Sequence, residues 1–202
     1  MKYKTHAFQL VGFSLFKYLN LLLITLRNFI IASALGPESY GVYSVTIVLQ
    51  QQLSLLGLGV RESISLKLAG LQESSNEFKD SVQSVIEFCI FIFTFTICIS
   101  LTLTHYATNF VEMYPTLNIA FRIAALSICF EILANVLRAR NNFGNIMIAE
   151  LLYVLISLIL IAIVAYFELD VYIFLNCIFI ATAVGLSYYV FTVKYFFQLR
   201  VP

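Results

Sequence analysis

Four polar side chains suited to binding an anion lie within the otherwise mostly apolar run 8–34. They are Lys17, Asn20, Arg27 and Asn28. In an α-helix all four would fall within an arc of about 100°, and the two cations would lie about 15 Å apart along the axis. We interpret this face as a cationic lining for an anionic substrate. The alternative is that Lys17 and Arg27 extend to the two opposite membrane interfaces.

A second polar stripe is expected in the run 116–138. Four of its residues would fall within an arc of about 80° on a helix, namely Ser127, Glu131, Asn135 and Arg138. We expect Glu131 and Asn135 to line a polar path. Glu131 either pairs with a cation of the run 8–34 or titrates and couples transport to protons.

Further polar positions lie inside apolar runs. Arg122 is on the opposite side of the run 116–138 and is the weaker candidate for anion binding. The three glutamines 50–52 cover most of a helix circumference, so at least one must face other helices, and we take Gln51 as polar lining. Glu87 and Glu150 lie near helix ends, where solvation at the interface is their expected role.

Signals of enzyme chemistry are weak. The sequence has no phosphate-binding loop, no GxSxG motif and no paired acidic motif. His6 and His105 are predicted on opposite sides of the membrane, and each cysteine lies in an apolar run, as expected of a buried thiol. We therefore expect no catalytic residues, metal, cofactor or nucleic-acid partner. The cysteines are Cys89, Cys98, Cys129 and Cys177.

The composition indicates which solvent these elements face. Of 202 residues, 61% are hydrophobic and 11% are charged, and the mean hydropathy is +0.92. Soluble domains carry about 25% charged residues. Too few charges are present to cover a surface in water, so the sequence predicts a membrane protein.

Six apolar runs are long enough to cross a bilayer, which takes about 20 helical residues. Regular strand alternation is absent, so we predict an all-α bundle of six transmembrane helices in one domain, residues 1–202. Short polar or turn-rich pieces separate the runs. The runs are 8–34, 40–60, 82–104, 116–138, 144–166 and 171–193.

The distribution of Lys and Arg predicts the orientation. With a cytoplasmic N-terminus, the three outer loops hold only acidic charges, namely Glu38, Glu112, Glu168 and Asp170. The cytoplasmic segments and helix ends hold nine basic residues. We therefore predict that both termini are cytoplasmic, and that the first run is a retained helix rather than a cleaved signal peptide. The nine are Lys2, Lys4, Arg61, Lys67, Lys79, Arg138, Arg140, Lys194 and Arg200.

Two segments that connect the apolar runs contain residues that predict their local structure. Pro37 cannot continue a helix and Gly36 can adopt a positive φ, so the chain should turn there. Tyr40 and Tyr43 then fall near the outer interface, where we expect them to act as anchors. The segment 61–81 is either an interfacial amphipathic helix or, as we favour, a continuation of the run 40–60 with a turn near 73–76.

The pattern after the first run is similar to that of a known family. Its residues are "LGPESYGVYSVTIVLQQQLSLLGLGVRESISLKLAG", and further along "ILANVLRARNNFGNIMIAELL". Both resemble bacterial polysaccharide flippases, which translocate O-antigen or capsule repeat units and belong to the multidrug/oligosaccharidyl-lipid/polysaccharide exporter superfamily. The resemblance implies translocation of a lipid-linked oligosaccharide across the bacterial inner membrane by alternating access. It also implies that cationic side chains attract the lipid pyrophosphate, a role that Lys17 and Arg27 fit and Arg122 fits less well.

The chain departs from that family in length. Family members have twelve to fourteen helices in two lobes, whereas six runs match one lobe, the N-terminal one. A single lobe cannot enclose a cavity against a second repeat. The chain is then a fragment, a split half or a half-transporter that dimerises. Two alternatives stay open, a membrane component of a polysaccharide complex that does not transport, and an exporter of drugs or small molecules from the same superfamily.

Overall fold

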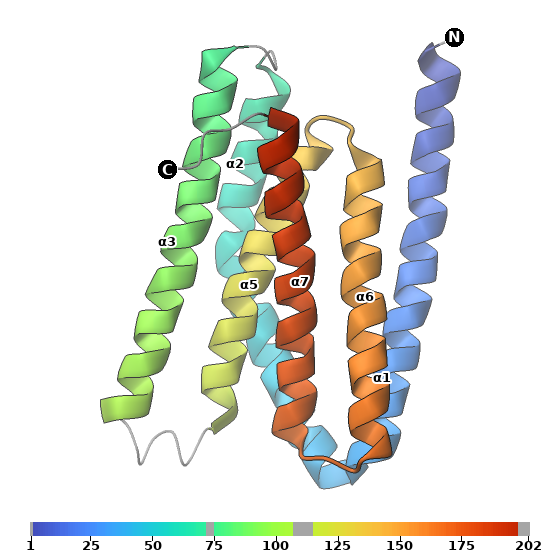
Figure 1. Ribbon diagram of the computed structural model, residues 1–202, viewed down its shortest axis with the longest axis vertical. Coiled ribbons are helices and arrows are strands. Elements are labelled where there is room, and N and C mark those ends of the chain that lie inside the picture. The colour runs from blue at the N-terminus through green and yellow to red at the C-terminus, as the bar shows by residue number, and fades with distance from the viewer. Residues whose placement is uncertain (1, 72–74, 107–114, 198–202) are drawn as a thin grey trace.

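In the computed structural model, the described residues form helices and no strand (Figure 1). The backbone is described for residues 2–71, 75–106 and 115–197, and the side chains for 11–55, 57, 59–71, 75–102 and 117–195. The prediction of an all-α fold is confirmed. The elements are α1 (Lys2–Ser54), the 3₁₀ helix η1 (Leu55–Gly57), α2 (Leu58–Ala69), α3 (Asn76–Tyr106), α5 (Pro115–Arg138), α6 (Phe143–Tyr166) and α7 (Val171–Phe197).

Five helices of the described chain are long and apolar enough to cross a membrane. The first of them, within α1, has 44 residues and consists of two helices joined at a kink. We call the parts of α1 before and after Gly36 its first and second arms. Counting these two arms separately, the described residues form six long helical segments, which correspond to the six predicted runs. The prediction of a multi-pass helical membrane protein is thus supported by the lengths and composition of the helices.

The kink in α1 lies at Gly36, where the backbone has φ 68° and ψ 172°. Such angles are accessible almost only to glycine, because a Cβ would clash with the backbone. Pro37 follows directly and cannot donate a helical hydrogen bond. The chain therefore folds back, and the second arm of α1 runs beside the bundle toward the end at which the first arm began (Figure 1). The predicted turn is confirmed.

The second arm is shorter than the predicted run 40–60. It ends at Ser54, η1 follows, and α2 begins at Leu58. A Cβ built on Gly57 would lie 2.9 Å from Cγ2 of Ile128, so glycine at this break allows the segment to approach α5 closely. α2 continues the course of the second arm, as the favoured interpretation of the segment 61–81 predicted. It also packs against α5.

α3 begins six residues before the predicted start at 82. The Ser75 hydroxyl accepts a hydrogen bond from the Phe78 backbone N–H at 3.1 Å, which is the geometry of an N-cap. This cap explains why the helix starts at Asn76. The predicted turn near 73–76 agrees with that start, although residues 72–74 lie outside the described chain. Glu112 and Arg200 of the charge pattern also lie outside it.

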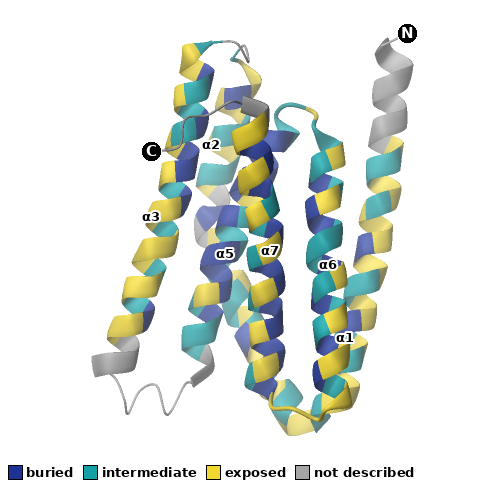
Figure 2. Ribbon diagram, viewed as in Figure 1, coloured by how far each residue is buried: buried dark blue, intermediate teal, exposed yellow. Residues whose placement is uncertain are grey.

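α5 is the central helix of the bundle. Buried residues make up 61% of its spanning window, compared with 17% in α1, and it packs against α1, α2, α3, α6 and α7. Apolar side chains also cover the outward faces of the bundle, which Figure 2 shows as exposed. An apolar outer surface of this kind suits a lipid environment.

The two ends of the bundle carry different charges. α1 begins and α7 ends at the same end, where the α5–α6 link also lies (Figure 1). Arg138 is the last residue of α5, and Arg140 lies in the link. The opposite end holds Glu38 beside the fold-back, and Glu168 and Asp170 between α6 and α7. The fold therefore gathers at one end the segments that the sequence pattern placed on one side of the membrane.

Candidate functional site

The first arm of α1 binds α6 through an ion pair. Lys17 Nζ lies 2.5 Å from Glu150 Oε1, and Asn20 Nδ2 donates to Glu150 Oε2 at 3.3 Å. The Glu150 side chain is 10% exposed and that of Lys17 is 42% exposed. The expectation that solvent at the interface solvates Glu150 is wrong. Glu150 lies about 10 Å along α6 from its start at Phe143, which places the carboxylate among packed helices.

One helical turn further along α6, Arg27 contacts neutral side chains. Its Nη1 lies 3.0 Å from the Tyr153 hydroxyl and 3.4 Å from Ser157 Oγ, and its Nη2 donates to Asn28 Oδ1 at 3.4 Å. The residue is 7% exposed, and Nε has no hydrogen-bond partner. Within the part of the chain that the structure describes, no carboxylate lies within ion-pair distance of this guanidinium.

Helical spacing explains why these groups meet. The three α6 residues are separated by three and four positions, so they share one face of that helix. The α1 residues share a face in the same way, as the sequence predicted. We call the combined set the α1–α6 interface, and it consists of Lys17, Asn20, Arg27, Glu150, Tyr153 and Ser157.

Tyr43 lies beside this interface rather than at the membrane surface. It is 4% exposed, packs in a cluster with Ile31, and is close enough to Arg27 to interact with its charge. The expected role of Tyr43 as an interfacial anchor is wrong. The fold-back at Gly36 turns the second arm so that the face bearing Tyr43 points into the bundle.

A second polar region is a cavity of about 220 Å³ between the helices. We call it the α5 pocket, because three of its residues come from α5. Side chains from α1, α2, α6 and α7 complete the wall. The lining residues are Gln50, Ser54, Arg61, Ser127, Phe130, Glu131, Tyr153 and Thr182.

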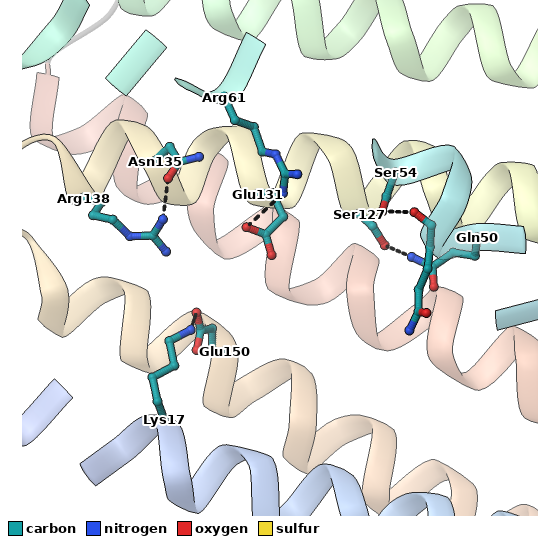
Figure 3. A network of polar contacts seen from close by, with 10 residues as sticks. Lys17, Gln50, Ser54, Arg61, Ser127, Glu131, Asn135, Arg138 and Glu150 are labelled. Carbon is teal, nitrogen blue, oxygen red and sulfur yellow. Dashed lines mark hydrogen bonds and ion pairs between the residues drawn. The ribbon is translucent and has the colours of Figure 1, made fainter. Parts of the chain in front are cut away.

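The ion pair in the α5 pocket is longer than the one in the α1–α6 interface (Figure 3). Gln50 Nε2 donates to Ser127 Oγ at 3.2 Å, and Arg61 Nη1 lies 3.7 Å from Glu131 Oε2. The Glu131 side chain is 48% exposed. The expected pairing of Glu131 with a cation of the first arm is wrong, because those cations face α6 whereas α2 lies directly on α5.

The glutamine that lines the pocket is Gln50, whereas the predicted Gln51 is exposed. Asn135, also predicted as lining, is buried, and its Oδ1 accepts a hydrogen bond from Arg138 Nη1 at 2.5 Å. The sequence analysis missed Tyr153, which belongs to both regions. The spacing of Tyr153 from Glu150 was the available signal.

Arg122 lies away from both regions. Its Nε donates to Ser100 Oγ at 2.9 Å, and it lines a separate cavity of about 250 Å³ with Phe93 and Phe179. The structure therefore brings Lys17 and Arg27 to one interface but does not bring Arg122 to it.

The described cysteines are free thiols. Cys89, Cys129 and Cys177 are buried as expected, but the prediction of a buried thiol is wrong for Cys98, which is exposed on α3. Among the described residues, no group of three or more His, Cys, Asp or Glu side chains is arranged to hold a metal ion.

Comparison with known proteins identifies no relative of this chain. No protein-family model, no curated protein and no solved structure matches it. The geometry of the α1–α6 interface and of the α5 pocket therefore carries the functional argument.

Proposed function

We propose that the chain is one lobe of a membrane translocase for a lipid-linked oligosaccharide whose anchor carries pyrophosphate. The observation that carries this proposal is the environment of Arg27. Its guanidinium lies in a helix long enough to span a bilayer, is 7% exposed, and among the described residues makes hydrogen bonds only to neutral groups.

A charge in this position is costly. Ionisable side chains within membrane-spanning segments are expensive and are typically paired, or mark the path of a substrate or an ion. Hydroxyl and amide oxygens satisfy some N–H groups of Arg27, but no carboxylate of the described side chains forms an ion pair with it. Because a guanidinium can bind phosphate oxygens through two parallel hydrogen bonds, a pyrophosphate is a suitable partner.

Lys17 has a different part in this proposal. Glu150 neutralises it, so the pair holds the first arm of α1 against α6 while Arg27 remains the group that attracts the anion. The first arm lies at the edge of the bundle, next to α6 (Figure 1). Movement of this arm away from α6 would open a path to Arg27, as alternating access requires.

The charge distribution supports an orientation. The end that bears Arg138 and Arg140 would face the cytoplasm, and the end that bears Glu38, Glu168 and Asp170 would face outward. Both termini are then cytoplasmic, and the membrane is the bacterial inner membrane. A second six-helix lobe, supplied by a longer product, a split partner or another copy, would complete the cavity.

The test replaces Arg27 with Gln in the native host and measures surface polysaccharide. We expect a loss of at least about tenfold with normal amounts of the protein in the membrane, because Gln keeps polarity but removes the charge. The control is Lys194→Gln, which removes an exposed positive charge near the end of α7. Normal polysaccharide in the Arg27 variant would overturn the proposal.

A further inference from the structure

The α5 pocket has the chemistry of a site for a neutral, hydroxyl-rich group. Its polar groups are an amide, hydroxyls, a carboxylate and a guanidinium, so they offer both donors and acceptors. The positive charge of Arg61 and the negative charge of Glu131 offset each other. This balance contrasts with Arg27, whose charge is not offset within the described residues.

The contacts within the pocket leave hydrogen-bonding capacity for a ligand. Arg61 and Glu131 are 3.7 Å apart, beyond the usual length of a charged hydrogen bond, and Glu131 is 48% exposed. Each carboxylate oxygen can accept more than one hydrogen bond, and each guanidinium has five N–H donors. The neighbouring Arg61 also disfavours a bound metal cation at Glu131, because the two positive charges would repel.

Aromatic rings form the other wall of the pocket. The rings of Phe130 and Tyr153 have centroids 6.0 Å apart, and the hydroxyl of Tyr153 is hydrogen-bonded to Arg27. Tyr153 therefore joins the pocket to the anion-binding group, because it lines the pocket and also contacts Arg27 through its hydroxyl and its ring. A ligand with adjacent anionic and hydroxylated parts could contact both regions.

We propose that the α5 pocket binds one uncharged sugar unit of the lipid-linked substrate while Arg27 holds the adjacent phosphate. The cavity of about 220 Å³ is smaller than the roughly 300–1,000 Å³ of sites for drug-sized ligands, which favours a single unit. Gln50 and Glu131 supply the hydrogen bonds, and Phe130 and Tyr153 supply apolar contact. This inference rests on the proposed function.

The experiment measures the Kd of the purified full-length chain in detergent micelles for two probes. One is polyprenyl pyrophosphate, and the other is the same lipid carrying a single N-acetylhexosamine. We expect tighter binding of the sugar-bearing lipid by about tenfold, the effect of one hydrogen bond to a charged group. Glu131→Gln should remove most of that difference and Gln50→Leu, which removes a neutral hydrogen bond, a smaller part of it; both should leave binding of the bare lipid unchanged.

The matched control is Glu87→Gln, which alters an exposed glutamate on α3 whose carboxylate is hydrogen-bonded to Gln83 one turn away. It should retain the preference for the sugar. Thermal unfolding of each variant separates lost binding from lost folding.

The outcomes distinguish the two proposals. Equal affinity of the wild type for both lipids, with binding still reduced by Arg27→Gln, would overturn the sugar site and leave the proposed function standing. If both pocket variants fold and still bind the sugar-bearing lipid more tightly, the sugar site would likewise be overturned and the proposed function would stand. Failure of the wild type to bind either lipid, or full binding by Arg27→Gln, would overturn the proposed function and the sugar site with it.

Discussion

The α1–α6 interface and the α5 pocket each contain a carboxylate beside a cation, but they hold these charges differently. Lys17 and Glu150 are 2.5 Å apart, and the carboxylate side chain is 10% exposed. Arg61 and Glu131 are 3.7 Å apart, and the carboxylate side chain is 48% exposed. The first pair closes an interface between two helices, whereas the second pair borders a cavity.

This difference separates two uses of charge inside one bundle. A close pair with a buried carboxylate contributes to the association of helices, and losing one partner leaves a costly charge. A pair 3.7 Å apart whose carboxylate is 48% exposed contributes less to stability, and its carboxylate is available to a ligand although the Arg61 side chain is 17% exposed. Arg27 shares the burial of the first region, although no carboxylate of the described chain neutralises it.

The largest expected effect is on the pair Lys17–Glu150. Glu150→Gln should lower the free energy of unfolding by about 2–3 kcal/mol, because Lys17 and Asn20 lose their charged acceptor. The value lies at or below the range for fully buried pairs because the Lys17 side chain is 42% exposed. Detergent unfolding followed by circular dichroism measures it.

The double variant Lys17→Met with Glu150→Gln is the control for that measurement. Removing both charges should recover much of the lost stability, since no unpaired charge remains. Additive losses in the double variant would mean that the two residues are not coupled, and the contrast between the two regions would disappear.

Gly36→Ala tests a feature on which both regions depend. A Cβ at φ 68° and ψ 172° is strained, so we expect a loss of about 2 kcal/mol in unfolding free energy. The fold-back places Tyr43 near Arg27 and Gln50 in the pocket, so both regions should be perturbed together. Gly41→Ala is the matched control, because nothing lies within 4 Å of a Cβ at that position. An equal effect of both substitutions would contradict the assigned strain.

The sequence predicted the faces in both regions, but not which residues lie opposite them. Periodicity orients a side chain about its own helix, and on that basis Lys17, Asn20 and Arg27 were correctly placed on one face. It does not specify the neighbouring helix, so a cation of the first arm was one of the two expected roles for Glu131, although α2 supplies its partner, Arg61.

Contacts between helices also determine the environments of Gln50 and Glu150, which helical periodicity alone does not specify. Among three consecutive glutamines, Gln50 is the one that faces α5 and donates to Ser127, whereas the next two are exposed. Glu150 lies close enough to a helix end to be assigned to solvent, yet the first arm of α1 covers it. The turn at Gly36 was predictable because its physical cause lies in two adjacent residues, Gly36 and Pro37.

Gly185→Ala should affect the pocket more than the interface. A Cβ there would lie 2.7 Å from Phe130 Cε2, and Phe130 is held against Tyr189 with ring centroids 4.7 Å apart. We expect a loss of about 1–2 kcal/mol in unfolding free energy from overpacking. In the lipid titration, the preference for the sugar should fall while binding of bare polyprenyl pyrophosphate persists.

Gly12→Ala is the control for this substitution, since nothing lies within 4 Å of a Cβ on Gly12 and alanine favours a helix. Unchanged stability and unchanged sugar preference in Gly185→Ala would show that the ring of Phe130 adjusts without cost. The pocket would then be less rigid than its aromatic contacts indicate.

The smallest expected effect concerns the pair Arg61–Glu131. In a double-variant cycle with Arg61→Gln and Glu131→Gln, the coupling energy should stay below about 1 kcal/mol, because Glu131 is half exposed although the Arg61 side chain is 17% exposed. The separation of 3.7 Å and the exposure of Glu131 are the reasons. When both cycles are measured under the same conditions, the coupling energies of Arg61–Glu131 and Lys17–Glu150 compare the two regions directly. A coupling as large as that of Lys17–Glu150 would make the pocket pair a structural contact, with little capacity left for a ligand.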